Sequence, residues 1–116
     1  MTQVSIYHNP RCSKSRQTLA LIQEQGIEPE VILYLETPPN KATLEELISL
    51  LAISPRDLLR RSEADYKDNG LSDSTLNDTQ LIQAMLDFPK LIERPIVVSN
   101  GKAALGRPPE NVLNII

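Results

Sequence analysis

Residues 3–16 read QVSIYHNPRCSKSR and combine a short strand, a break and the start of a helix. The first six of these residues alternate between apolar and polar, which is typical of a strand. Pro10 ends the strand because proline has no N–H to donate to a neighbouring strand. A helix is then expected to begin at Cys12 or Ser13 and to end at Gln25.

Further strands are predicted on both sides of a polar middle section. Val31–Leu35 is a continuous apolar run, which we interpret as a buried strand that completes a strand–helix–strand unit. Residues 95–105 predict a hairpin, because Asn100-Gly101 is a strong turn signal between two short apolar runs. The residues after Pro108 predict a short terminal helix.

The section between these strands is predicted to be helical. Thr43 with Glu46 forms the pattern of a capping box, and Asp78 is a candidate cap for a later helix. The resulting order is β-α-β, a helical block and β-β-α. This order predicts an α/β fold with a thioredoxin-like four-stranded mixed sheet and a helical insertion at about residues 43–90, within a single domain of residues 1–116.

The composition of the 116-residue chain limits its chemistry. Its one cysteine, Cys12, cannot form an internal disulfide, and with one histidine, His8, no bound metal is expected. The net charge of −3 argues against nucleic acid as a partner. Because the sequence holds no run of about 18 apolar residues, we expect no membrane contact and a cytoplasmic protein with a reduced thiol.

Positive charge is concentrated near the two ends of the sequence. Residues 1–23 hold three cations and no acid, residues 94–109 hold three cations and no acid, and residues 24–93 hold six cations and fourteen acids. In a thioredoxin-like sheet the loop after the first strand meets the turn before the third strand. Cys12 is therefore expected to lie in a positive pocket, the alternative being that these cations are solvated surface residues.

Cys12 is the candidate nucleophile, since a thiolate is the reactive form of cysteine. Its place at a helix N-terminus is expected to lower its pKa below about 8.5. His8 is expected to contribute as a protonated imidazole within reach of the thiolate, the alternative being a strand histidine that is bonded to the backbone. A position in a polar loop predicts an accessible thiol rather than a buried, inert one. The cations that follow it closely in sequence are expected to act in the same direction: Arg11, Lys14 and Arg16.

The spacing Cys12-Ser13-Lys14-Ser15 is a C-x-x-S arrangement, with serine where a dithiol motif has its second cysteine. Because the chain has no other cysteine, it cannot resolve its own oxidised adduct, and turnover requires an external thiol. Ser15 either donates a hydrogen bond to the sulfur or only serves the start of the helix.

Three arginines and a proline complete the candidate site: Arg60 after a short helix, Arg94 before Pro95, and Arg107. Each arginine alone is a candidate surface cation. Guanidinium groups bind oxyanions bidentately, however, so Arg94 and Arg107 at the turn facing Cys12 predict a tetrahedral oxyanion held over the thiolate. Pro95 is predicted to follow a cis peptide bond, because thioredoxin-like folds place one opposite the cysteine.

Several stretches resemble the glutaredoxin-dependent arsenate reductase family, in the same order and over essentially the whole chain. The resemblance implies a thioredoxin-like fold. Ser13-Lys14 differs from the small residues, such as Gly-Thr, of well-established members, which bears on the substrate. The matching stretches are Ile6–Arg16 (IYHNPRCSKSR), Leu33–Pro39 (LYLETPP), Leu58–Arg60 (LLR), Glu93–Val98 (ERPIVV) and Gly106–Pro108 (GRP).

This resemblance implies an arsenate reductase without a bound cofactor. Cys12 attacks arsenate to form a thiol–arsenate adduct, glutathione acts on it as co-substrate, glutaredoxin resolves the product, and arsenite leaves. His8 matches a residue that helps to activate the thiol, and Ser15 matches the serine linked to keeping it charged. The arginines that match the family's oxyanion-binding residues are Arg60, Arg94 and Arg107.

Two other functions occur on similar chains. One is a glutathione-dependent thiol reductase that acts on another substrate. The other is a redox regulator that binds RNA polymerase, but that branch usually has a C-x-x-C pair, and Ser15 removes the second thiol.

Overall fold

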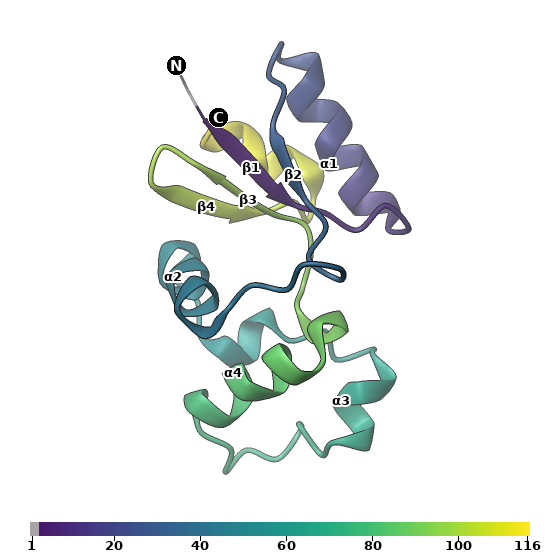
Figure 1. The fold of residues 1–116 in the computed structure, drawn as a ribbon, viewed down its shortest axis with the longest axis vertical. Helices are drawn as coiled ribbons and strands as arrows, with labels where there is room; N and C mark the ends of the chain where they lie inside the picture. The colour runs from purple at the N-terminus through teal and green to yellow at the C-terminus, as the bar shows by residue number, and fades with distance from the viewer. Residues whose placement is uncertain (1–2) are drawn as a thin grey trace. The chain divides into compact units, whose positions relative to one another are not determined.

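The computed structural model describes residues 3–116, and the chain forms two compact units (Figure 1). One unit combines Met1–Thr37 with Arg94–Ile116 and contains the sheet, whereas the other, Pro38–Glu93, is helical. The predicted order of β-α-β, helices and β-β-α is confirmed. That the two units act as a single domain stays a prediction.

The sheet unit contains four strands in the order β2-β1-β3-β4. β1 (Val4–Tyr7) pairs in parallel with β2 (Glu30–Ile32) and in antiparallel fashion with β3 (Ile96–Ser99), and β3 pairs with the antiparallel β4 (Lys102–Leu105). This mixed sheet with an inserted helical section is the predicted thioredoxin-like fold, which is therefore confirmed.

Two helical segments of this unit pack against the sheet and each other: α1 (Ser13–Glu24) and the 3-10 helix η3 (Pro109–Asn114). Alternate residues of a strand point to the same face, so β1 presents its two buried aliphatic residues to the same side. Packing on this core holds the N-terminus of α1 close to the end of β1. The core cluster comprises Val4, Ile6, Ile22, Val97 and Val112.

The predicted hairpin is present, with Asn100-Gly101 as its turn. Both residues have positive φ, 55° at Asn100 and 71° at Gly101. Asparagine and glycine tolerate this left-handed region, and a two-residue turn of this kind matches the twist of the two strands. The turn therefore sets the register of β3 against β4, in which Ser99 faces Lys102.

β2 is shorter and more exposed than the predicted strand Val31–Leu35. Its pairing ends where Ile32 lies opposite Tyr7, because β1 ends there. The chain then turns, and the backbone N–H groups of Glu36 and Thr37 both donate to Leu33 O at 2.9 Å. β2 lies at the edge of the sheet and Val31 is 44% exposed, so the prediction of a buried strand was wrong.

The helical unit contains α2 (Lys41–Leu51), η1 (Pro55–Leu58), α3 (Ala64–Asp68), α4 (Asp78–Asp87) and η2 (Pro89–Leu91). α2 and α4 pack against each other. No helix among the described residues 3–116 is long and apolar enough to cross a membrane. The side chains that α2 and α4 bury are Leu44, Leu47, Ile48, Leu81, Ile82 and Met85.

Asparagines cap the two longer helices of this unit. Asn40 Oδ1 accepts a hydrogen bond from Thr43 N–H at 2.8 Å, so Asn40 is the N-cap of α2. The predicted capping box at Thr43 was therefore wrong. Asn77 forms a capping box with Gln80, one residue before the predicted cap Asp78. Asparagine caps a helix as well as threonine or aspartate does, so several positions fitted the pattern equally well.

Candidate active site

Cys12 lies between β1 and α1, at the N-cap position of the helix. Its N–H donates to Asn9 O at 3.0 Å, and Arg16 Nη1 donates to Pro10 O at 2.9 Å, so the turn before Cys12 folds back onto the helix. Cys12 is only 8% exposed, so the prediction of an accessible loop residue was wrong. The first turn of α1 contains no acid, which leaves the positive end of the helix unopposed at the sulfur.

The pKa of Cys12 is lower than that of an ordinary thiol. Burial alone raises this pKa. The backbone N–H groups of Ser15 and Lys14 at the start of α1 lower it, and so do the charges of Arg94 and Arg107. These favourable interactions with the thiolate outweigh the cost of burying it.

The guanidinium groups that act on Cys12 come from the far end of the sequence. Arg94, before the third strand, and Arg107, after the fourth, both lower the pKa of Cys12. That they hold an oxyanion over the thiolate stays a prediction. The expectation that the charges of Arg11, Lys14 and Arg16 lower this pKa was wrong, since Lys14 acts only through its backbone N–H. The guanidinium of Arg16 is instead bonded to the backbone, and its charge lowers the pKa of His8.

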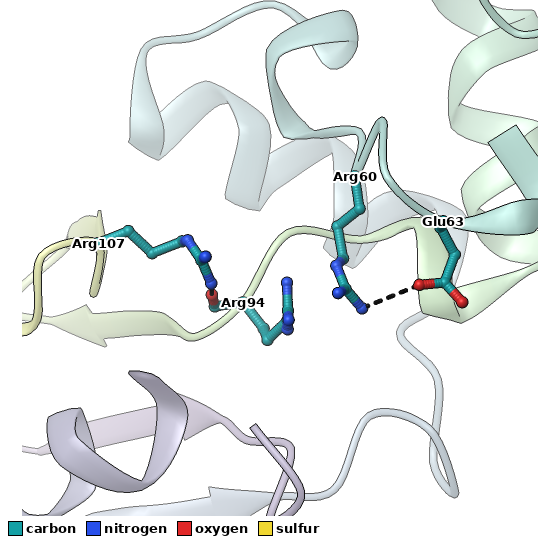
Figure 2. Close-up of polar contacts among 4 residues, drawn as sticks. All are labelled: Arg60, Glu63, Arg94 and Arg107. Atoms are coloured by element: carbon teal, nitrogen blue, oxygen red, sulfur yellow. Dashed lines mark hydrogen bonds and ion pairs between the residues drawn. The ribbon is translucent and has the colours of Figure 1, made fainter. Parts of the chain in front are cut away.

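The segments on either side of the β3–β4 hairpin are linked by hydrogen bonds. Arg107 Nη1 donates to Arg94 O at 3.2 Å, as Figure 2 shows. Gly106 N–H donates to Pro95 O at 2.9 Å. The peptide bonds that precede Pro95 and Pro108 are both cis. The two arginines are thus held at the same end of the hairpin.

Two residues that the sequence analysis did not single out connect this end of the hairpin to α1. Thr18 is fully buried, and its Oγ1 donates to Lys14 O at 2.8 Å and lies 3.4 Å from Gly106 O. A Cβ on Gly106 would lie 2.8 Å from Pro95 Cγ and 2.9 Å from Thr18 Cγ2, so only glycine fits there. In the sequence, the glycine directly before Arg107 was the one indication of this close approach.

His8 and Ser15 are buried and bonded to each other. Ser15 Oγ lies 2.6 Å from His8 Nδ1 and accepts a hydrogen bond from Asn9 N–H at 3.0 Å. Burial and the charge of Arg16 lower the pKa of His8, so the imidazole is neutral near pH 7. The expected protonated imidazole was therefore wrong, because a buried ring beside a cation loses its proton.

Arg60 belongs to the helical unit, Pro38–Glu93. It follows η1, and its backbone N–H donates to Leu91 O at 2.8 Å. Its guanidinium forms an ion pair with Glu63 at 3.2 Å, also drawn in Figure 2. The two side chains are only 19% and 23% exposed, so the pair is largely shielded from solvent.

The sheet unit therefore combines a thiolate with two guanidinium groups. Such an arrangement suits nucleophilic attack on an oxyanion, because the cations both stabilise the thiolate and attract the anion. The side chains described in residues 3–116 include no group of three or more His, Cys, Asp or Glu that could hold a metal ion.

Comparisons with known proteins agree with this geometry. The model of the ArsC family matches residues 7–115. The chain is 50% identical to an arsenate reductase of Escherichia coli, over all of this chain and 82% of that relative. It is 62% identical to the uncharacterised protein YfgD of E. coli K12, over 98% of this chain and 97% of the relative.

A solved structure is similar over nearly the same length. The arsenate reductase from Vibrio cholerae superposes with a TM-score of 0.97 at 54% sequence identity, and the match covers 99% of this chain and 98% of that one.

Proposed function

This chain belongs to the ArsC family, and we propose that it is an arsenate reductase that takes its electrons from glutathione and glutaredoxin. The observation that carries the proposal is the lowered pKa of Cys12 beside Arg94 and Arg107, in a chain with one cysteine. The thiolate can attack an oxyanion, and the missing second thiol means that the electrons come from outside the chain. Relatives named arsenate reductase support arsenate as the oxyanion.

In the proposed reaction, the Cys12 thiolate attacks arsenic and one oxygen leaves as water, so that a sulfur–arsenic bond forms while arsenic stays As(V). The thiol of glutathione then displaces a second oxygen as water. A glutaredoxin thiolate attacks the glutathione sulfur, and the bond between that sulfur and arsenic breaks. Its electron pair reduces arsenic to As(III), which is still bonded to Cys12. The two external thiols end as one mixed disulfide. Water then displaces Cys12 from arsenic, so that arsenite leaves and Cys12 is again a thiolate.

Each polar residue of the site has a proposed part in this reaction. Arg94 and Arg107 bind the oxyanion next to the thiolate, and Arg60 contributes a third guanidinium. His8 and Ser15 position the turn that carries Cys12 and so help to activate it. Pro95 shapes the connection that carries Arg94.

The remaining features of the proposal concern the surroundings of the enzyme. We expect the reaction in the cytoplasm, where an isolated thiol stays reduced and glutathione is available. The small negative charge of the chain, −3, is consistent with small thiols and glutaredoxin as partners rather than nucleic acid.

An arsenite-release assay tests the proposal. Purified chain with arsenate, glutathione and glutaredoxin is expected to form arsenite, omission of either thiol component is expected to stop turnover, and Cys12→Ser is expected to be inactive. Arsenite formation by Cys12→Ser would contradict the proposed mechanism. Inactivity of the native chain on arsenate, with retained glutathione-dependent disulfide reduction, would support a thiol reductase of another substrate.

A further inference from the structure

A groove of about 280 Å³ lies on the sheet unit, between the turn that precedes Cys12 and the turn that follows β2. The first turn contributes Asn9 and Arg11 to its lining, and the second contributes Leu33, Leu35 and Glu36. Neither Arg11 nor Glu36 has a part in the reaction described above. Binding of the proposed oxyanion therefore does not explain this groove.

The two turns bring opposite charges to the lining. Arg11 comes from one turn and Glu36 from the other, and the described residues contain no ion pair between them. A simple anion such as arsenate is disfavoured by Glu36, and a simple cation is disfavoured by Arg11. A ligand that carries both signs of charge satisfies both residues, since each then gains a partner of opposite charge.

The rest of the lining suits a peptide with a short apolar portion. Leu33 and Leu35 provide apolar surface, and Leu35 is 38% exposed. His8 also lines the groove, as a ring that is neutral near pH 7 and is held through its Nδ1 by Ser15.

The groove is also close in the structure to the reacting residue. Asn9, which lines it, accepts a hydrogen bond from Cys12 N–H at 3.0 Å. A thiol bound in the groove is therefore next to the turn that presents Cys12.

We propose that this groove binds glutathione, an inference that rests on the proposed function because glutathione must approach the arsenic adduct on Cys12. Glutathione is a tripeptide with an ammonium group, two carboxylates and a central thiol. Glu36 pairs with the ammonium group and Arg11 with a carboxylate, while the leucines contact the central part of the peptide. This assigns the groove to the second substrate and leaves Arg94 and Arg107 to the oxyanion.

Binding can be measured without any reaction by using S-methylglutathione, whose sulfur is blocked. Titration into the full chain, followed by backbone amide NMR, is expected to shift the signals of Asn9, Arg11, Leu33 and Glu36 in a saturable manner. Glu36→Gln and Arg11→Gln are each expected to raise the Kd about threefold to tenfold. The matched controls, on exposed residues elsewhere in the same unit, are Glu24→Gln and Lys102→Gln, which are expected to leave the Kd unchanged.

An analogue of S-methylglutathione that lacks the ammonium group identifies the partner of Glu36. It is expected to bind more weakly to the native chain and to show no further loss with Glu36→Gln. The inference is overturned if no saturable shift occurs at millimolar S-methylglutathione, if the shifts lie outside the groove, or if Glu36→Gln behaves like Glu24→Gln. Failure to release arsenite would contradict the proposed function alone, since this binding measurement needs no arsenate.

Discussion

Ser15 Oγ lies 2.6 Å from His8 Nδ1, and this hydrogen bond joins the first turn of α1 to the residue that follows β1. The same oxygen accepts a hydrogen bond from Asn9 N–H at 3.0 Å. A single buried hydroxyl therefore fixes both ends of the turn that presents Cys12.

Ser15→Ala is expected to lower the free energy of unfolding by about 1–3 kcal/mol, because it leaves buried polar groups of His8 and Asn9 without a partner. Urea denaturation measures this loss. Ser13→Ala, on an exposed residue of the same helix turn, is the control and is expected to change stability by less than about 0.5 kcal/mol. Equal effects of the two substitutions would show that the hydroxyl is not a structural link.

Arg94→Gln and Arg107→Gln are each expected to raise the pKa of Cys12, because each removes a positive charge that stabilises the thiolate. The KM for arsenate is expected to rise about tenfold, the size of one charge-assisted hydrogen bond. Thiolate absorbance against pH reports on Cys12 alone, since the chain has one cysteine. Lys102→Gln is the control, and an equal rise in the pKa with this variant would point to net charge instead.

Arg60→Gln is expected to raise the KM for arsenate while leaving the pKa of Cys12 in place, because the groups that shift this pKa all lie in the sheet unit. Loss of the ion pair is expected to lower the free energy of unfolding by about 1–3 kcal/mol, because it leaves the largely buried Glu63 carboxylate without its partner. Steady-state kinetics and thiolate titration separate the two effects. An unchanged KM would remove Arg60 from the proposed oxyanion site.

Gly106→Ala is expected to destabilise the fold by about 1–3 kcal/mol, because the new methyl group would press on Pro95 and Thr18. It is also expected to raise the KM for arsenate, since Arg107 is the next residue. Thr18→Ala makes room for the methyl group, so the double variant is expected to lose less stability than the two single losses added together. Simple additivity in this double-mutant cycle would contradict a direct contact.

The stability of the native chain is expected to rise with pH relative to Cys12→Ser. The folded pKa of Cys12 is lowered, so the unfolded chain binds more protons between that pKa and about 8.5, the usual value for cysteine. The extra stability is therefore complete above about pH 8.5 and is lost as the pH falls through the folded pKa. Urea denaturation of both chains over a pH series measures the difference, and parallel curves would contradict a lowered folded pKa.

Local patterns were enough to predict the strands of the sheet, apart from the bounds and burial of β2, and the position of the thiol at the start of α1. Pro10 marks the end of β1, and Asn100-Gly101 marks the hairpin, because each residue type has a backbone preference that acts without distant neighbours. The order of strands and helices then allows few ways to build a sheet. The N-terminal position of Cys12 on α1 follows from the same local signals.

The electrostatics of the site depend on the folded chain and were predicted less well. Neighbours in sequence suggested Arg11, Lys14 and Arg16 as the charges beside the thiolate, but a side chain several atoms long can bond to the backbone, as that of Arg16 does. The neutral state of His8 depends on its burial, which no local pattern reveals. The close approach of Thr18 to Gly106 likewise requires α1 and the hairpin to be packed together.

The pairing of β1 with β3 has a consequence for the newly made protein. Cys12 precedes Arg94 and Arg107, which help to lower its pKa, in the sequence, so it is synthesised before them. Until β3 docks beside β1, the cysteine lacks these charges and has a thiol of more ordinary reactivity. Full activation of Cys12 thus requires the folded sheet and not only the sequence around the cysteine.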